Sequence, residues 1–174
     1  NWRGTASFDN LLFDRLSTLS RTPADQNVLI ITIDERSLKA LGKWPWPRKY
    51  HAELLSKLDE AEPRSILFDI LLSEPSNEQD DFALAQAMRG KTPVYLPMNF
   101  PTPGSDGKNY DIESPLPLFS KEAEGVGHVN IEFDEDGIVR RTSLCFKPES
   151  EGRSWLHITE LVYRLTGNPS PAAK

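Results

Sequence analysis

Two adjoining stretches decide the expected fold of this 174-residue chain: VLIITID at residues 28–34 and GKWPWPR at residues 42–48. The first is a run of apolar, largely β-branched residues closed by one acid, which is typical of a strand buried on both faces of a sheet. The second holds two prolines, which exclude regular helix and central strand. We therefore predict a strand near the middle of an α/β sheet, with a stiff loop capping the carboxyl edge where such sheets hold ligands.

Outward from these stretches, apolar periodicity predicts alternating helices and strands. The expected elements are helices over residues 7–19, 37–41 and 47–61, a helix that starts at residue 77 or 80 and ends at residue 88, and strands over residues 28–34, 65–72 and 93–98. Ser7 is the expected N-cap of the first helix, and Asn77 or Asp80 that of the fourth. The resulting βαβαβ order is typical of a mainly parallel sheet with helices on its faces.

The second half departs from this order. Residues 100–120 are rich in proline and are expected to form an ordered surface excursion or a lid. Strict apolar–polar alternation over residues 127–133, followed by the turn DEDG, predicts an antiparallel hairpin with residues 138–146. A last helix is expected over residues 154–165, with Ser154 as its N-cap. The predicted fold class is α/β: a mainly parallel β-sheet flanked by helices, with a C-terminal antiparallel β-hairpin and terminal helices.

Composition excludes several classes of protein. The chain has 26 acidic and 20 basic residues, a net charge of −6 and a pI near 5.1, which argue against nucleic-acid binding and against a polybasic membrane contact. Its single cysteine, Cys145, allows no internal disulfide. The apolar runs fall far short of the roughly 18 residues that a membrane span needs. Because the chain begins at Asn1 without a methionine, we expect residues 1–174 to be a single domain excised from a longer protein.

Two acids follow the first two predicted strands. Asp34 and Asp69 would meet at the carboxyl edge of the sheet, where a buried carboxylate needs a partner. Arg48 is the candidate partner, because the helix dipole disfavours a cation in a first turn unless an anion offsets it. Two interpretations stay open: a structural pair of Arg48 with Asp34 or Asp69 that pins the loop, or a ligand-binding group.

Aromatic and further acidic residues lie around the same edge. Trp44 and Trp46 can be hydrophobic plugs or a stacking platform for a flat or sugar-like ligand. Glu74, Asp80 and Asp81 could join the strand-end acids in an oxygen-rich cation site, or could serve the dipole of the next helix. The candidate ligand-binding residues are therefore Asp34, Trp44, Trp46, Arg48, Asp69, Glu74 and Asp81.

Motifs of catalysis are hard to find. The chain has no glycine-rich phosphate loop after the first predicted strand, no G-x-S-x-G elbow and no H-E-x-x-H pair. No catalytic residue, no cofactor and no metal ligand set is assigned. A cation-dependent phosphohydrolase that uses Asp34 and Asp69 as ligands remains a weaker alternative, supported by those two acids alone.

A family resemblance runs along nearly the whole chain. Its residues are Ile33-Asp34, Ser37-Leu38, Leu41-Gly42, Trp44-Pro45-Trp46-Pro47-Arg48, His51, Phe68-Asp69-Ile70, Glu74-Pro75, Asp81, Leu84-Ala85, Gly127-His128-Val129-Asn130, Asp134, Asp136-Gly137, Val139-Arg140-Arg141 and Ser154-Trp155-Leu156. In these positions the chain resembles the type-two CHASE domain, an extracellular sensory module of bacterial signalling receptors. The most specific part is WPWPR after an IDE strand.

The resemblance implies a sensor domain, without catalysis of its own, on the periplasmic or extracellular side of an inner-membrane protein. It implies an N-terminal membrane helix, several C-terminal ones, and a cytoplasmic histidine kinase, nucleotide cyclase, diguanylate cyclase or serine/threonine kinase. The expected partners are these membrane helices and output domain, a second copy of the receptor, and an unknown small ligand, cation or periplasmic protein. The competing function is a structural dimerisation domain that senses nothing.

Overall fold

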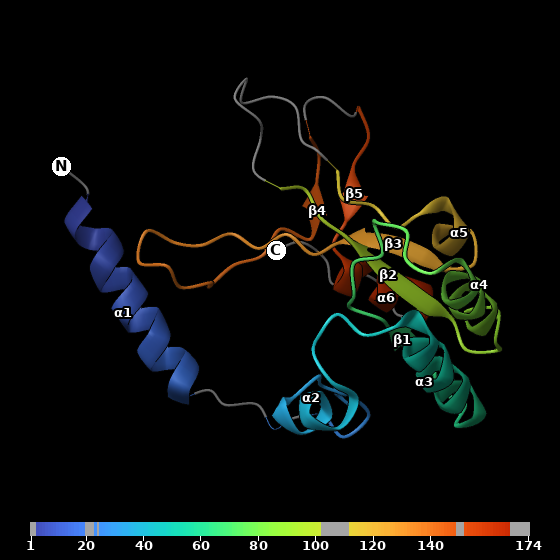
Figure 1. Ribbon diagram of the computed structural model, residues 1–174. Coiled ribbons are helices and arrows are strands. Elements are labelled where there is room, and N and C mark those ends of the chain that lie inside the picture. Colours follow the sequence, from blue (N-terminus) through green and yellow to red (C-terminus); the bar gives the residue numbers. More distant parts are fainter. Residues whose placement is uncertain (1–2, 20–22, 24, 102–111, 149–151, 168–174) are drawn as a thin grey trace. The chain divides into compact units, whose positions relative to one another are not determined.

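The computed structural model describes residues 3–19, 23, 25–101, 112–148 and 152–167 of the chain (Figure 1). Two compact units are distinguished, Asn1–Trp44 and Pro45–Lys174, and each is described by itself. No helix among the described residues is long and apolar enough to cross a membrane.

The N-terminal unit holds two helices, α1 (Arg3–Leu19) and α2 (Glu35–Leu41). Both were predicted, but α1 begins four residues before Ser7, so that residue lies inside the helix rather than at its N-cap. Helix α2 ends at Gly42, whose φ of 93° is a conformation that other residues adopt only with strain. The predicted end of this helix at residue 41 is confirmed.

Between these helices lies the stretch that was expected to be the central strand. That prediction is wrong: residues 28–34 form no regular element, and Leu29 and Ile30 are 81% and 78% exposed. The backbone N–H of Val28 donates to the carbonyl of Asp25 in the preceding turn, not to a neighbouring strand. An apolar run becomes a strand only where another strand pairs with it, and no ladder is formed here.

The C-terminal unit is built on a three-stranded parallel sheet of order β1-β2-β3. Its strands are β1 (Ile66–Leu67), β2 (Val94–Met98) and β3 (Gly125–His128). The mainly parallel sheet is thus confirmed, and β2 matches its predicted position closely. Strand β1 is far shorter than the predicted residues 65–72, because the ladder with β2 ends at Leu67.

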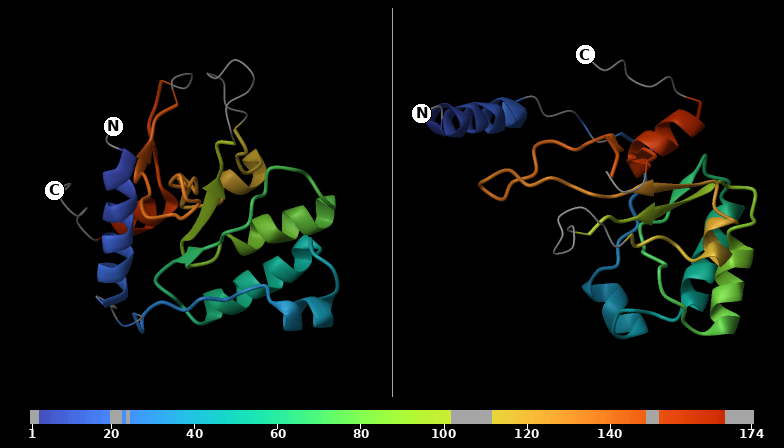
Figure 2. Two further views of the ribbon diagram at one scale, coloured as in Figure 1. Left: turned by 90° about the vertical axis from the view of Figure 1, so that its left-hand side faces the viewer. Right: turned by 90° about the horizontal axis from the view of Figure 1, so that it is seen from above.

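Helices cover both faces of this sheet (Figures 1 and 2). On one face α3 (Arg48–Glu60), α4 (Glu78–Ala87) and α5 (Pro117–Ser120) bury a core that includes Leu96 of β2. On the other face lies α6 (Ile158–Leu165), packed closely against β3. A Cβ on Gly127 would lie 2.7 Å from the Cα of Ile158, so only glycine permits this approach.

The C-terminal part is antiparallel, as predicted, but with other members. The turn after Asp134 forms, and the N–H of that residue donates to the carbonyl of Ile138. The antiparallel ladder, however, joins β4 (Cys145–Phe146) to β5 (Trp155–Leu156), and between residues 127–133 and 138–146 there is one isolated bridge. Because residues 155–156 are strand, α6 begins at Ile158 with His157 as its N-cap, so the prediction of Ser154 is wrong.

The predicted excursion over residues 100–120 falls largely on residues 102–111, which lie outside the described residues. At its described margins, Asn99 and Glu113 form an antiparallel bridge. Helix α5 then returns the chain to the core, where Phe119 is fully buried.

Candidate functional site

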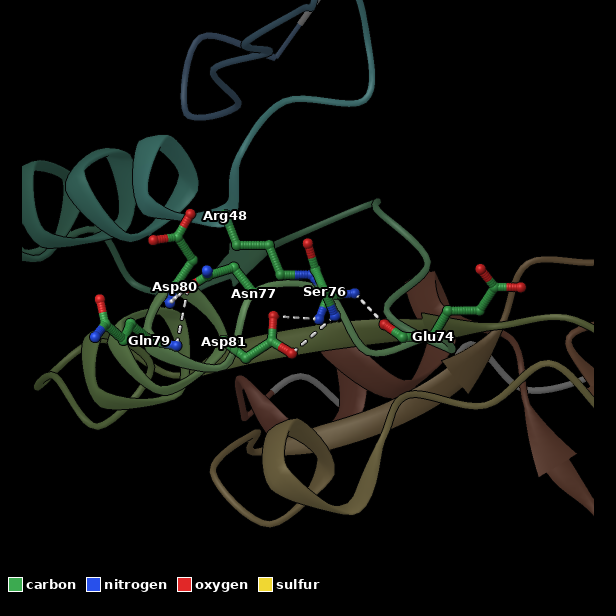
Figure 3. A network of polar contacts seen from close by, with 7 residues as sticks. All are labelled: Arg48, Glu74, Ser76, Asn77, Gln79, Asp80 and Asp81. Atoms are coloured by element: carbon green, nitrogen blue, oxygen red, sulfur yellow. Dashed lines mark hydrogen bonds and ion pairs between the residues drawn. The ribbon is translucent and has the colours of Figure 1, made fainter.

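Arg48 anchors a junction of three segments at the carboxyl edge of the parallel sheet (Figure 3). It is the first residue of α3, and its Nη1 lies 2.7 Å from Oδ1 of Asp81 in the first turn of α4. Its Nη2 donates to the carbonyl of Glu74 in the connection between β1 and α4. One guanidinium therefore ties the starts of two neighbouring helices to the loop between them.

The carboxylate of Asp81 is satisfied on both oxygens. Oδ1 accepts from Arg48, and Oδ2 accepts from the backbone N–H of Ser76 at 3.0 Å. The side chains of the ion pair are only 11% and 7% exposed, and the guanidinium also lies 5.0 Å from the centre of the Phe119 ring. A desolvated pair with its hydrogen bonds complete is a structural brace, and breaking it strands a buried charge.

The partner differs from the two that were considered, because the structure pairs Arg48 with Asp81 and not with Asp34 or Asp69. Asp69 is exposed, since it follows the end of β1 by two residues and no longer lies on the ladder. Sequence spacing did not single out Asp81, which lies 33 residues after Arg48 and meets it because α3 and α4 pack side by side.

Asp34 and Trp44 belong to the N-terminal unit. Asp34 caps α2: its Oδ1 accepts from the backbone N–H of Ser37 at 2.8 Å and from the hydroxyl of Ser37 at 2.7 Å. These hydrogen bonds, chiefly the backbone one, lower the pKa of Asp34 below its ordinary value. Trp44 is 43% exposed.

Trp46 packs within the C-terminal unit. Its ring is half-buried and stacks on His51 of α3, with 6.3 Å between ring centres. His51 in turn meets the edge of Phe68 and is 5% exposed, and desolvation, together with the charge of Arg48, lowers its pKa. Within the C-terminal unit, WPWPR is thus held by an aromatic stack at Trp46 and by an ion pair at Arg48.

The polar residues that follow β1 have different roles: some begin α4, and others have exposed side chains. Asn77 caps α4 by accepting hydrogen bonds from the N–H groups of Gln79 and Asp80. Asn77 was one of the two N-caps predicted for this helix. Asp80 and Asp81 lie in the first turn, where the helix dipole favours negative charge. Glu74 uses only its carbonyl in the junction and leaves its side chain exposed. In the part of the chain that the structure describes, no group of three or more His, Cys, Asp or Glu residues could hold a metal ion.

A second polar group was missed. His128, expected on the polar face of a half-buried strand, is 1% exposed at the end of β3. Its ring lies against His157, with 5.1 Å between the ring centres, and against Phe100 and Phe146. The apolar–polar alternation of residues 127–133 predicted an exposed His128. A sequence pattern does not show that β4 and β5 pack against this end of the sheet.

A family model for the CHASE2 domain matches residues 1–169, nearly the whole chain. The chain belongs to the CHASE2 family. CHASE2 domains are sensory domains of membrane receptors, not catalytic ones, and act on the extracellular side. No curated protein and no solved structure shows a significant match to the chain. The resemblance read from WPWPR and its neighbours is therefore confirmed.

Proposed function

We propose that this CHASE2 domain is the periplasmic sensor of a bacterial transmembrane receptor and relays an external signal to a cytoplasmic kinase or nucleotide or diguanylate cyclase. Membership of the family supports the sensory role. The receptor would work as a homodimer, with the domain joined to its own membrane helices. The signal would be a small ligand, a cation or a periplasmic protein.

The junction at Arg48 is the observation that supports the carboxyl edge as the responsive region. It links α3, α4 and the connecting loop through one buried guanidinium, so a change at any of the three segments alters the others. Three of the predicted contact residues belong to the same unit: Asp69 and Glu74 are exposed, and Trp46 is half-buried. These three are the proposed ligand contacts in the C-terminal unit, while Arg48 and Asp81 hold them in place. The part of the site predicted at Asp34 and Trp44 stays a prediction.

A thermal-shift screen of metabolites and divalent cations tests this proposal. A compound bound at the edge raises the melting temperature of the wild type. The matched variant is Asp69→Asn/Glu74→Gln, which removes two exposed charges without touching the ion pair. A ligand that stabilises the wild type and this variant equally binds elsewhere and removes the support for the edge.

The relay is tested on the full-length receptor. The output activity of the cytoplasmic domain is measured with and without the ligand found in the screen. Replacement of Asp69 and Glu74 should abolish the response while leaving the basal output intact. A response that survives the replacement contradicts the proposed site, and no response in the wild type to a ligand that binds the domain contradicts the sensory relay.

A further inference from the structure

Two histidines and three aromatic residues form a compact group at the end of the parallel sheet, here called the histidine cluster. It comprises Phe100, His128, Phe146, Trp155 and His157. The two imidazoles meet edge to face at an interplanar angle of 87°. Phe100 contacts both Phe146 and Trp155, with ring centres 4.9 Å and 6.2 Å apart. Among the described residues, the rings that lie around His128 are those of Phe100, Phe146 and His157, and none of them carries a negative charge.

The ring of His128 lacks hydrogen-bond partners among the described residues. Neither Nδ1 nor Nε2 has one, and the residue is 1% exposed. A neutral imidazole tolerates this position at some cost, but a charged one does not, because an isolated ion in an apolar surrounding loses its hydration. Desolvation, and the charge of His157, lower the pKa of His128 to about 4.

His157 is sensitive to protonation for a different reason. It is the N-cap of α6: its Nδ1 lies 2.8 Å from the hydroxyl of Thr159 and accepts from the N–H of the same residue at 3.4 Å. An imidazolium carries a proton on both nitrogens, so it cannot accept this bond. It also places a positive charge at a helix N-terminus, which the dipole disfavours. Burial lowers the pKa of His157 as well.

The cluster lies on a seam between two parts of the C-terminal unit. His128 ends β3 and forms a parallel bridge to His157, which joins β5 to α6. Backbone hydrogen bonds flank the seam on its two sides: the N–H of His157 donates to the carbonyl of Leu144 at 2.9 Å and continues the β4–β5 pairing, and the N–H of Val129 donates to the carbonyl of Met98 at 3.0 Å and continues the β2–β3 ladder. Protonation of either imidazole therefore acts where α6 and the β4–β5 pair meet the sheet.

The surrounding elements carry other titratable groups, of which Glu160 pairs with Arg164, and Arg153 lies over Trp155 at the border of the cluster. These groups are Tyr95 on β2, Cys145 on β4, Arg153 before β5, and Glu160 and Arg164 on α6. The carboxylate of Glu160, the acid on the helix that follows His157, lies 2.5 Å from Nε of Arg164. The guanidinium of Arg153 lies 3.5 Å from the centre of the Trp155 ring. The charge that acts on His128 is that of His157, and like charges oppose protonation of both.

We propose that the histidine cluster is a proton-sensing site: uptake of protons by His128 and His157 opens the seam between β3 and the β5–α6 connection. The proposal names acidification as a signal that the domain senses. Its role in signalling therefore rests on the proposed sensory function. The opening itself is a property of this chain and is independent of any relay.

The direction and size of the effect follow from linkage. The closed seam holds His128 neutral down to about pH 4, whereas an opened seam lets it titrate near its ordinary value of 6.5. The closed state is therefore fully favoured above pH 6.5 and loses stability as the pH falls from there toward 4. For this residue alone, the equilibrium constant of opening rises about 30-fold between about pH 7.5 and about pH 5.

Hydrogen exchange of the backbone amides that flank the seam tests this opening, because release of the seam loosens the ends of the two ladders in which these amides are bonded. The probes are the N–H groups of Val129 and His157, with exchange rates divided by the intrinsic rate at each pH. We expect their protection to fall about 30-fold over that pH range in the wild type. The double variant H128F/H157N should show no such fall. Phenylalanine fills the aromatic site, and asparagine keeps a capping side chain that does not titrate.

A matched control is H51F, which removes the buried histidine of α3 and should leave the exchange at the seam unchanged. Low urea separates local opening from global unfolding, because a local opening exposes little surface. Seam exchange with the same urea slope as the Met88 amide of α4 overturns the proposal. So does a pH dependence that persists in H128F/H157N.

Titration of the wild-type histidine rings by NMR stands independently of whether the variants fold. The inference requires that the His128 ring does not titrate near pH 6.5 in the closed domain, and ordinary titration there overturns it. Failure of the proton site would leave the sensory function intact if the receptor still answers a ligand from the screen. Conversely, an opening seam without any change in receptor output would count against the relay alone.

Discussion

Two apolar runs of this CHASE2 domain differ in structure: one is an exposed segment without regular structure, and the other is a buried strand. Residues 28–33, VLIITI, have the stronger strand propensity, yet they form no strand and are exposed. Residues 94–98, VYLPM, contain Pro97, which cannot donate to a ladder, yet they form the buried central strand β2. The difference is pairing: β2 has a parallel neighbour on each side, and the structure gives residues 28–33 none. Strand propensity alone is therefore not sufficient, because a segment becomes a strand only when a neighbouring strand pairs with it.

Of the changes that bear on this comparison of the two runs, truncating β2 has the largest expected effect. Leu96 is fully buried in the core, so Leu96→Ala should lower the free energy of unfolding by about 2–5 kcal/mol. The free energy is measured by urea denaturation. A loss below 1 kcal/mol, as for a typical surface position, would break the assignment of β2 as the core strand.

The next effect is that of pH on the buried histidines of the C-terminal unit. Because the pKa of His128 is lowered to about 4, its stabilisation is complete above pH 6.5 and is lost as the pH falls toward 4. From this residue we expect a loss of about 2 kcal/mol between about pH 7.5 and about pH 5. His51 and His157 act in the same direction, since their pKa values are also lowered.

Urea denaturation across this range should show the decline in the wild type and a shallower one in His128→Phe. A flat profile would contradict the burial of neutral histidine. Below about pH 4 a further loss is expected. The carboxylates of Asp34 and Asp59, whose hydrogen bonds lower their pKa values, are protonated there.

A smaller effect compares the helix caps of the two units. Asn77→Ala removes the acceptor for two N–H groups of α4 and should cost about 1 kcal/mol, whereas Asn77→Asp should restore most of it. Asp34→Ala, the equivalent change at α2, should lower the protection of the α2 amides against hydrogen exchange and leave those of α4 unchanged. Loss of protection in α4 would show that the two helices are not independent.

The smallest effect is expected in the exposed run. Ile30 is 78% exposed, so Ile30→Ala should change the free energy of unfolding by no more than about 0.5 kcal/mol. Urea denaturation of this variant beside Leu96→Ala tests the contrast between the two runs. A cost of several kcal/mol would mean that residues 28–33 are packed, as their sequence first suggested.

The sequence predicted what depends on local pattern and missed what depends on tertiary neighbours. Helices α3 and α4 lie close to their predicted positions because periodicity, Asn77 and the prolines are local signals. The partner of Arg48 could not be read from spacing, since Asp81 is 33 residues away. Nor could the burial of His128, because Phe100, Phe146 and His157, whose rings lie against it, are distant from it in the sequence.

The family was recognisable for a related reason. WPWPR combines a rigid backbone with two contacts, the stack of Trp46 on His51 and the ion pair of Arg48 with Asp81. Each contact needs a specific side chain, so the motif is distinctive. An apolar strand, in contrast, can be built from many sequences and therefore does not identify a family.

A double-mutant cycle on Arg48 and Asp81 tests the central claim most directly, namely that this motif braces the carboxyl edge of the sheet. The variants are Arg48→Ala, Asp81→Ala and the pair together, each measured by urea denaturation. We expect each single change to cost about 3–5 kcal/mol and the double change to cost little more, with a coupling energy of about 2 kcal/mol or greater. Single costs that simply add, with no coupling, would contradict the brace.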